Sequence, residues 1–554
     1  RTWGTIGIYR GPFRQPMCLP EDRRSQLIVA KLVYTRWTVS AGGGGCLRLP
    51  RWSGKIRLGV PLTAIEVVVP DRGPRHWHAV LVERLGVAGH AVSVVHQPGA
   101  DRWPVLMEAA LRFERRLFRR REPGLASPIS AIAEVSSSGA PDLRLDLSGV
   151  AGPGGVPTLR LAFDGNYSDA AAVLALAEGR LPKIEAVLDG SRIVGQALPM
   201  VDKRESTALG ADDVLARAMT LVLSLVARFD ENGCWGEEAA EGRRAASRRS
   251  TAPGGFRFAT SYAGRALPRL GREALRRARF RHAHWRVGYR FIDGPGIAET
   301  GRIGTGWLQV PDKGDHFYAD PFPFEWQGRY FIFVEDYPHA TKKAVISVVE
   351  FGGDGTPLPP KPVLEEPFHL SYPQVFAWNG AIWMLPEGSA SGRLTLYRAA
   401  DFPHRWVAET TLLEGEISDA TLLEHGGRWW LFATARDGFG STSDTLAVFW
   451  APSPTGPWTP HAKNPILIDR RMARPGGAFV QVDGKLLLPV QDGTRGYGGG
   501  LGLSDVLELD LEKVELSAPR AVREKGDWPY PQIHTLNRAG RLEVIDGIAA
   551  VRKR

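Results

Sequence analysis

Apolar and polar positions alternate in two different ways along the chain, and the first pattern covers residues 55–230. Short β-branched apolar runs there predict strands, and apolar residues spaced three and four apart predict helices. The expected strands are Ile65–Val69, Ala91–Val95, Leu143–Leu147, Thr158–Phe163 and Lys183–Leu188, and the expected helices are Trp77–Leu85, Ala170–Ala177 and Asp212–Phe229. Strands alternating with helices predict a Rossmann-like α/β domain with a largely parallel sheet.

The second pattern begins near Trp285, where helical spacing stops and aromatic residues, Gly and Pro become dense. A polar anchor, an apolar strand, a turn glycine and a second strand recur five times. The turn glycines are Gly328, Gly380, Gly427, Gly484 and Gly540, so successive turns are 52, 47, 57 and 56 residues apart. A period near 50 with tight glycine turns is typical of propeller blades. Residues 285–554 are therefore predicted to form an all-β five-bladed propeller; a β-sandwich with chance spacing is the alternative.

Two segments fit neither pattern. Residues 1–54 lack sustained periodicity and are expected to be poorly ordered. Residues 231–284 are expected to be a linker, with a basic helix near Arg269–Arg281. The chain is thus multidomain: an N-terminal α/β domain at 55–230 and a C-terminal all-β propeller.

Composition narrows the function classes. The net charge of +10 comes from short arginine runs without a recognised nucleic-acid motif, so no nucleic-acid partner is expected. No apolar run reaches 18 residues, so no membrane span is expected. The sequence begins at Arg1 without a signal-peptide pattern, which favours a cytoplasmic location. Three scattered cysteines predict neither a disulfide framework nor a metal site.

The polar anchors should meet at the centre of the ring, because the first strand of each blade lines the central channel. They are Asp320, Tyr372, Asp419, Arg474 and His534, and a second set after the hairpins contains Glu335, Glu387, Gln491, Asp492 and Asp546. Clustered carboxylates are costly unless they are paired or used. Glycoside hydrolysis uses two, an acid and a base or nucleophile. Nearby aromatics such as Tyr318 would stack on sugar rings, and Arg474 and His534 would bind hydroxyls or a phosphate. The structural alternatives are a turn cap for Asp320 or Asp419, a solvated loop for Glu387, a core histidine for His534, and pairing of Arg474 with a carboxylate.

The first anchor lies in Phe317-Tyr318-Ala319-Asp320-Pro321-Phe322, which resembles the Asp-Pro motif of five-bladed glycosidases of the arabinanase, β-xylosidase (glycoside hydrolase family 43) and levansucrase type. This resemblance implies that Asp320 is a general base or nucleophile. Acid and pKa-tuning roles would fall on Glu387 and Asp419, in either order. Some such propellers hold a central calcium, so calcium is a possible ligand although no cofactor is predicted.

Further motifs resemble a narrower family, the propeller at the N-terminal side of plant glucosamine inositolphosphorylceramide transferase and of bacterial proteins. They include Pro386-Glu387, Ser418-Asp419-Ala420-Thr421, Arg474-Pro475-Gly476-Gly477, Gln491-Asp492 and His534-Thr535-Leu536-Asn537. In that family the transferase chemistry belongs to a separate C-terminal domain. We expect no such domain here, so transferase activity is not implied.

The α/β region is faintly similar to the Rossmann-like half of formyltransferases, which use an Asn/His/Asp set. Asp146 and Asn166 exist, but no histidine lies between His96 and His282, so the proton shuttle is missing. The resemblance implies a degenerate relative, and an unrelated α/β domain is the alternative.

Three functions remain open. The first is a glycoside hydrolase-like enzyme acting in the propeller funnel, with catalytic Asp320, Glu387 and Asp419 and substrate-binding Tyr318, Glu335, Tyr372, Arg474, Gln491, Asp492 and His534. The second is a non-catalytic glycan-binding or polysaccharide-assembly module. The third is an α/β transferase whose propeller presents substrate. The expected partner is a glycan or a sugar-containing small molecule.

Overall fold

The computed structural model describes residues 63–98, 103–120, 123–135, 139–150, 155–229, 253–281 and 284–553. The prediction that residues 1–54 are poorly ordered lies outside these ranges. So does most of the predicted linker.

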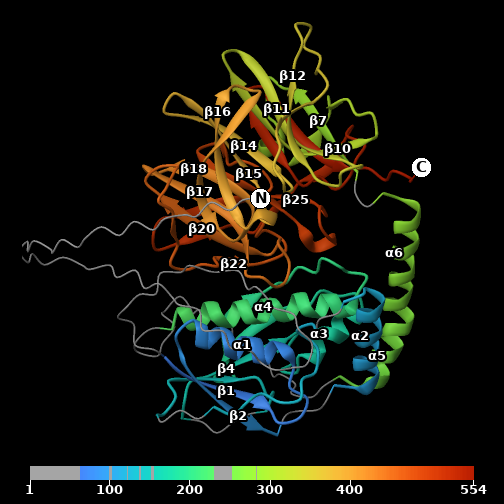
Figure 1. Ribbon diagram of the computed structural model, residues 1–554, viewed down its shortest axis with the longest axis vertical. Coiled ribbons are helices and arrows are strands. Elements are labelled where there is room, and N and C mark those ends of the chain that lie inside the picture. Colours follow the sequence, from blue (N-terminus) through green and yellow to red (C-terminus); the bar gives the residue numbers. More distant parts are fainter. Residues whose placement is uncertain are drawn as a thin grey trace, which may run out of the picture. The chain divides into compact units, whose positions relative to one another are not determined.

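Residues 63–229 contain a six-stranded sheet with the order β2-β1-β3-β4-β5-β6 (Figure 1). The strands β1 to β4 pair in parallel, and β5 and β6 add an antiparallel edge. Their bounds are β1 Ala64–Pro70, β2 Ala91–Gln97, β3 Leu143–Asp146, β4 Thr158–Phe163, β5 Ile184–Leu188 and β6 Arg192–Ala197. Each predicted strand is present within two residues of its expected ends. The sequence reading missed β6, because Gly195 and polar residues interrupt its apolar pattern.

The helices of this region are α1 His76–Val87, α2 Val105–Leu117, α3 Ala170–Ala177 and α4 Thr207–Ala227. Helix α4 is buried around most of its circumference, which explains why its apolar pattern is broad. Helix α2 was not predicted, since its arginines were interpreted only as a charge run. The segment expected to be a linker contains α5 Gly255–Ser261, a π-helical turn Tyr262–Ala266 and α6 Leu267–Arg279. The last of these is the predicted basic helix, two residues earlier than expected.

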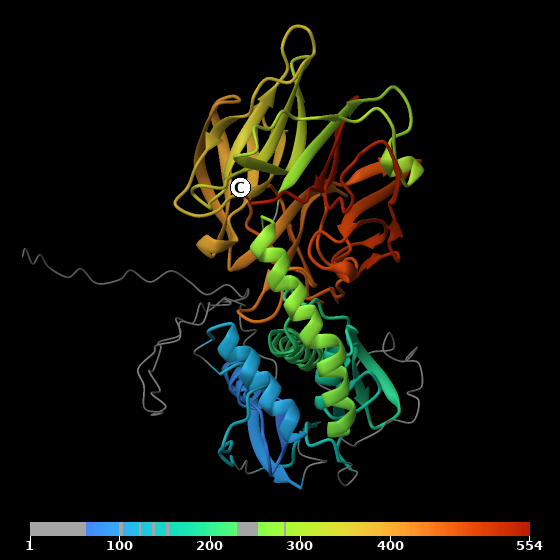
Figure 2. The same cartoon turned by 90° about the vertical axis from the view of Figure 1, so that its right-hand side faces the viewer.

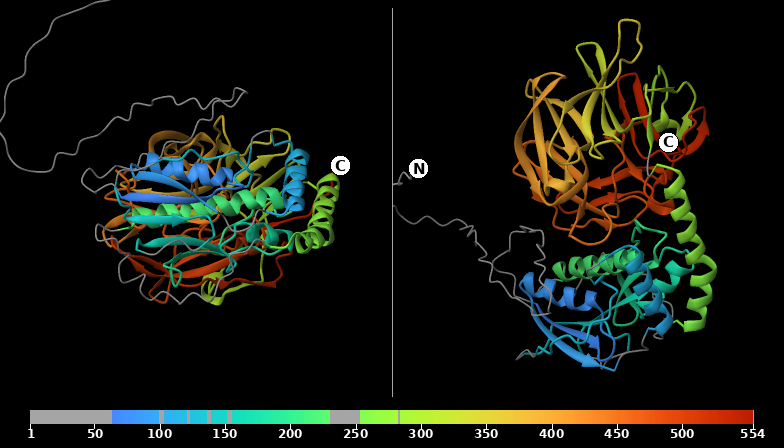
Figure 3. Two further views of the ribbon diagram at one scale, coloured as in Figure 1. Left: turned by 90° about the horizontal axis from the view of Figure 1, so that it is seen from below. Right: turned by 45° about the vertical axis from the view of Figure 1, so that its right-hand side comes forward.

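After residue 284 the chain forms five antiparallel sheets arranged around a common centre (Figures 1 and 3). Four of them follow the chain as consecutive strands, and their inner strands are β10, β14, β18 and β23. The strands of the first two blades are β10 His316–Trp326, β11 Arg329–Pro338, β12 Val345–Glu350, β13 Lys361–Leu364, β14 Ser371–Trp378, β15 Ala381–Glu387, β16 Arg393–Asp401 and β17 Arg405–Glu414. Those of the next two are β18 Glu416–His425, β19 Arg428–Arg436, β20 Thr445–Ala451, β21 Thr459–Pro460, β22 Leu467–Ile468, β23 Val480–Val482, β24 Lys485–Gln491, β25 Leu501–Leu509, β26 Val514–Leu516 and β27 Arg520–Ala521.

The fifth blade closes the ring with strands from both ends of the propeller, in the order β29-β30-β7-β9. These strands are β7 Trp285–Phe291, β9 Leu308–Gln309, β29 Leu536–Ala539 and β30 Leu542–Ile548. Figure 2 shows the green strand β7 beside the red C-terminal strands, and β30 pairs with β7 over seven residues from Leu542 to Ile548. A short helix α7 Ile297–Thr300 and the parallel pair β8 Arg302–Gly304 and β28 Arg523–Gly526 accompany this blade. The predicted five-bladed propeller is confirmed by this strand order.

The blade hairpins turn where the glycine repeat predicts. Gly328, Gly380, Gly427 and Gly484 have φ values between 71° and 75°, and the residue before each also has a positive φ. Two consecutive positive φ angles are required by the tight hairpin turn that suits twisted strands. Among the described residues, no helix is long and apolar enough to span a bilayer.

Candidate active site

Three of the predicted anchors occupy the same irregularity in the first three blades. Asp320, Tyr372 and Asp419 have φ angles of 47°, 49° and 48°, the left-handed region that non-glycine residues seldom adopt. At each one the pairing of the inner strand with its neighbour shifts register, as in a β-bulge. A bulge redirects one side chain and stores local strain, a combination that is common at functional sites. Arg474 and His534 instead lie in irregular segments before β23 and β29.

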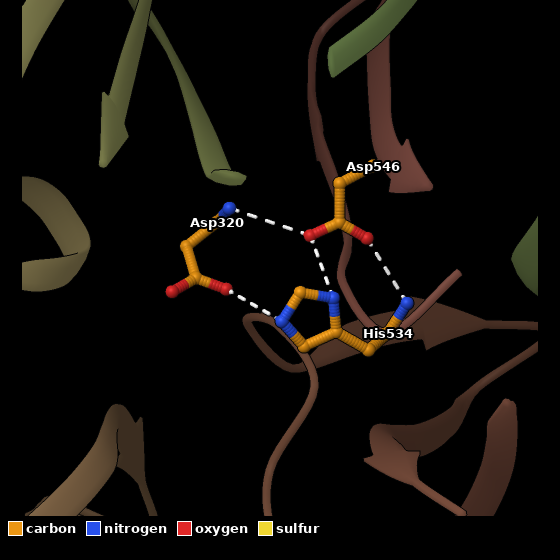
Figure 4. A group of neighbouring side chains, drawn as sticks. All are labelled: Asp320, His534 and Asp546. Carbon is orange, nitrogen blue, oxygen red and sulfur yellow. Dashed lines mark hydrogen bonds and ion pairs between the residues drawn. The ribbon is translucent and has the colours of Figure 1, made fainter. Parts of the chain in front are cut away.

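Asp320 lies beside the histidine of the fifth blade (Figure 4). Its Oδ1 is 3.2 Å from His534 Nε2, and the hydroxyl of Thr535 donates to the same oxygen at 3.0 Å. His534 Nδ1 is 2.8 Å from Asp546 Oδ2, and the backbone N–H of His534 donates to Asp546 Oδ1 at 3.0 Å. The imidazole therefore bridges two buried carboxylates.

This bridge sets the charges of the group. Burial disfavours a charged imidazole, but the charge of Asp546 and the hydrogen bond with Asp320 raise the pKa of His534 to about 10. Burial also raises the pKa of Asp320, but the hydrogen bond and charge of His534 outweigh it and lower that pKa overall. At neutral pH His534 is therefore an imidazolium beside an ionised Asp320.

Asp419 is held by the fourth blade. Arg474 donates to both of its oxygens, from Nε at 2.5 Å and from Nη2 at 3.1 Å, and Gln491 Nε2 donates to Oδ2 as well. This two-pronged geometry is the strong form of an arginine–carboxylate pair. Burial raises the pKa of Asp419 well above its usual range, and the charge of Arg474 opposes that rise. Arg474 is fixed further by Thr442 and Ser443, to which its Nη1 donates.

Glu387 keeps the most solvent contact of the three predicted catalytic acids. Its side chain is 12% exposed, against 5% for Asp320 and 2% for Asp419. Ser389 donates to its Oε1 at 2.8 Å, and the backbone N–H of Asp419 donates to its Oε2 at 3.1 Å. Arg474 Nη2 is 3.6 Å away, so a single guanidinium lies close to two of the acids.

Tyr372 connects distant blades across the ring. Its hydroxyl accepts a hydrogen bond from the backbone N–H of Gly477 at 2.7 Å and is 2.9 Å from Thr421 Oγ1. Since Tyr372, Thr421 and Gly477 come from three blades, this hydroxyl fixes their spacing. Its role is architectural, and its ring packs edge-on against Phe322.

The other predicted binding residues divide into two groups. Glu335 is buried, 3.1 Å from His369 Nε2, and interacts electrostatically with Asp320 and His534, so it belongs to the cluster. Tyr318 instead packs in an apolar cluster with residues such as Val287 and Tyr289. Asp492 caps a turn, because its side chain accepts from the backbone N–H of Thr494. The structure thus does not bring Tyr318 and Asp492 to the cluster.

The sequence reading left four neighbours of the cluster out of the site. The Trp285 ring lies 4.1 Å from the His534 ring, and the half-exposed Tyr497 lies 5.3 Å from the Arg474 guanidinium. His369 lies 3.1 Å from a Glu335 oxygen, and the Thr535 hydroxyl donates to Asp320. The fifth-blade motif contains Thr535, which could have signalled it; Trp285 and Tyr497 enter from β7 and from the loop before β25, outside the repeat.

The ligand atoms of Asp320, His534 and Asp546 lie within 4.8 Å of one another, a spacing that could hold a metal ion. Calcium prefers six to eight oxygen ligands. Here both imidazole nitrogens face carboxylates, and the imidazolium already supplies the positive charge. These three residues fit an ion pair better than a calcium site, and a central calcium stays a prediction.

The fold and the cluster define a five-bladed propeller whose buried central acids pair with an arginine and a histidine. Residues 309–539 match the family described as glucosamine inositolphosphorylceramide transferase 1, N-terminal. The resemblance seen in the motifs is therefore confirmed for this part of the chain.

Curated relatives of that name come from plants. The Arabidopsis thaliana protein is 34% identical over 222 residues, which are 38% of this chain and 29% of that protein. The Oryza sativa subsp. japonica protein is 32% identical over 256 residues, which are 43% of this chain and 34% of that protein. The chain thus spans about a third of the length of these relatives.

Solved structures with detectable similarity include sugar-acting enzymes. The catalytic domain of Coprinopsis cinerea GH62 α-L-arabinofuranosidase has a TM-score of 0.33 and 16% identity, covering 43% of this chain and 83% of that chain. The Xanthomonas citri GH43_1 enzyme complexed with xylose has a TM-score of 0.29 and 14% identity, covering 38% and 76%.

Proposed function

We propose that the propeller is a carbohydrate-acting, glycoside hydrolase-like module whose site is the central carboxylate cluster. The observation that carries the proposal is the gathering of Asp320, Glu387 and Asp419 from three blades around one guanidinium and one imidazolium. The confirmed relatedness to a family named for a glucosamine-containing substrate supports the substrate class.

The environments of the acids suggest their roles. Asp320 is the base or nucleophile, because its neighbours hold its pKa low and keep it ionised. Glu387 takes the acid role, because its side chain is the most exposed of the three. Asp419 positions Arg474, which would contact sugar hydroxyls or a phosphate through its fork.

Asp320→Asn tests this proposal. Asparagine preserves the shape and tolerates a positive φ, so the fold should survive while the charge is lost. Against a panel of oligosaccharides and aryl glycosides, with products identified by mass spectrometry, the parent should turn over at least one substrate and the variant none detectably. Asp492→Asn, which makes the same change at a turn-capping aspartate outside the cluster, is the matched control. Full activity in Asp320→Asn would overturn the assignment.

A second candidate is glycan binding without turnover. Every oxygen of Asp419 and Glu387 already accepts a hydrogen bond from the protein, as expected of a structural network. In that case the protein shows saturable binding on a glycan array and no product after long incubation, and Asp320→Asn retains binding.

For residues 55–230 we propose a Rossmann-like fold related at a distance to formyltransferases, without that reaction. The order β2-β1-β3-β4 in parallel supports the fold. An experimental structure in which these strands were not parallel would contradict it.

A further inference from the structure

A pocket in the α/β region lies at the place where open parallel sheets bind ligands. The chain runs from β1 through α1 to β2 on one side and later returns to β3 on the other side of β1. At such a switch point the loops after the two strands diverge and leave a crevice at their carboxyl ends. The pocket is lined by Pro70 and Arg72 after β1, by Asp146 and Ser148 at the end of β3, and by the start of α1.

Two buried nitrogen donors in this pocket lack partners. His78 and Arg75 are each 2% exposed and both line it. Neither His78 Nε2 nor Arg75 Nε has a hydrogen-bond partner among the described residues. A buried donor without a partner destabilises the fold, so two together at one pocket need an explanation.

The local hydrogen bonds show that both nitrogens carry hydrogen. The backbone N–H of Arg75 donates to His78 Nδ1 at 3.1 Å, so in the neutral imidazole the proton is on Nε2. Burial lowers the pKa of His78 to about 4, which keeps the ring neutral at pH 7. Arg75 is anchored from its two terminal nitrogens, by Glu108 at 2.8 Å and by the Ala126 carbonyl at 3.4 Å, whereas its Nε has no partner.

Each carboxylate oxygen of the two pocket aspartates, in contrast, already accepts at least one hydrogen bond from the protein. Asp146 accepts from Ser148 and from Arg160, and Asp169 accepts from the indole N–H groups of Trp77 at 3.0 Å and Trp103 at 2.7 Å. The donors without partners in this pocket are therefore nitrogens, while every carboxylate oxygen of Asp146 and Asp169 has a protein donor. Arg72 at its mouth and the N-terminal end of α1 add positive potential.

We propose that this pocket binds a compact ligand through carboxylate or phosphate oxygens, which accept hydrogen bonds from His78 Nε2–H and Arg75 Nε–H. The rings of Trp103 and Tyr167 line the same pocket and would flank the remainder of the ligand. The Arg75 guanidinium stacks 3.9 Å from the Trp103 ring centre, which holds its Nε in place. The site is separate from the propeller cluster and does not depend on the function proposed for it.

The test uses the full chain with acetate and with inorganic phosphate, at constant ionic strength against chloride. Binding to the folded state raises the midpoint of thermal unfolding in proportion to the logarithm of ligand concentration. We expect one of the two anions to produce a saturable shift, and the one that does identifies the oxygen chemistry.

Three variants decide whether the shift comes from this pocket. His78→Asn retains an acceptor for the Arg75 N–H but removes the Nε2 donor, and Arg75→Gln removes the guanidinium; each should weaken binding at least tenfold. Arg112→Gln removes the same charge from an exposed position of α2 and should bind like the parent.

Histidine-selective NMR provides a readout that does not depend on the variants' stability. The resonance absent from His78→Asn should move on titration of the parent. Saturation that is unchanged in both variants, or no shift and no movement of that resonance with either anion, would overturn the proposal.

Discussion

The propeller centre and the α/β pocket each bury a histidine, and at pH 7 the first is positively charged and the second neutral. His534 bridges Asp320 and Asp546, which raises its pKa to about 10. His78 is desolvated without a bridging acid, and its pKa falls to about 4. Burial acts in the same direction on both; the carboxylates at contact distance decide the result.

The comparison extends to hydrogen bonding. In the propeller, most cluster side chains hydrogen-bond to one another across blades, although His534 Nδ1, 2.8 Å from Asp546 Oδ2, makes an ion pair without an aligned hydrogen bond. In the α/β pocket, donors are fixed in position and left without acceptors. A satisfied network stabilises the fold and tolerates no deletion, whereas an unsatisfied one lowers stability until a ligand arrives. The following variants test this difference.

His534→Gln should have the largest effect, and the effect depends on pH. A histidine whose folded pKa is raised contributes stability that is complete below pH 6.5 and is lost as pH rises through about 10. The full contribution is on the order of 5 kcal/mol. Urea unfolding from pH 6 to 10 should show the parent losing stability and the variant, weaker at pH 6, changing little. His404→Gln, which alters a half-exposed histidine, should follow the parent. Parallel curves for parent and His534→Gln would contradict a charged bridge.

Arg474→Met should cost about 3–5 kcal/mol, because it leaves Asp419 buried without its countercharge. Arg398→Met is the control, since the pair of Arg398 with Glu409 is exposed and worth less than about 1 kcal/mol. Chemical denaturation of both variants at pH 7 checks this. Equal losses of unfolding free energy in Arg474→Met and Arg398→Met would mean that the cluster is open to water.

His78 should change the free energy of unfolding at acidic pH instead. A histidine whose folded pKa is lowered reduces stability as pH falls from 6.5 to about 4, because the unfolded chain binds the proton and the folded chain does not. The parent should lose up to about 3 kcal/mol over this range from this group. His78→Asn should lose correspondingly less in the same unfolding series. If parent and His78→Asn lose the same stability between pH 6.5 and 4, His78 is not the neutral donor that the pocket requires.

Tyr372→Phe should have the smallest effect, about 1–3 kcal/mol, through the unsatisfied N–H of Gly477. Tyr397→Phe loses a hydrogen bond to the partly exposed Glu366 and should cost less. Amide hydrogen exchange at Gly477 is the sharper measurement, because only Tyr372→Phe should accelerate it. Unchanged protection would mean that another group holds the fourth blade.

The repeat in the sequence predicted the ring because glycine turns are local features with fixed φ requirements. It also predicted that Asp320, Asp419, Arg474 and His534 converge, since the start of each blade must face one centre. The bulges at Asp320, Tyr372 and Asp419 were not predictable from propensity, because aspartate and tyrosine adopt a positive φ there only under tertiary constraint.

The sequence could not separate residues that line the site from packing residues two positions away on the same strand. Tyr318 and Asp320 both lie on β10, yet one packs between sheets and the other joins the cluster. The α/β pocket was missed for a different reason. Its donors matter because they lack partners, and the absence of a partner is a property of three-dimensional structure.

The joint between β7 and β30 has a consequence for synthesis of the protein. β7 ends at Phe291, and its partner β30 begins only at Leu542. At a translation rate of about 5–20 residues per second, the first strand waits on the order of 10–50 s for the second. During that interval one edge of β7 is unpaired, and unpaired strand edges attract foreign strands. A nascent chain of this kind should therefore depend on ribosome-associated chaperones until its last blade emerges.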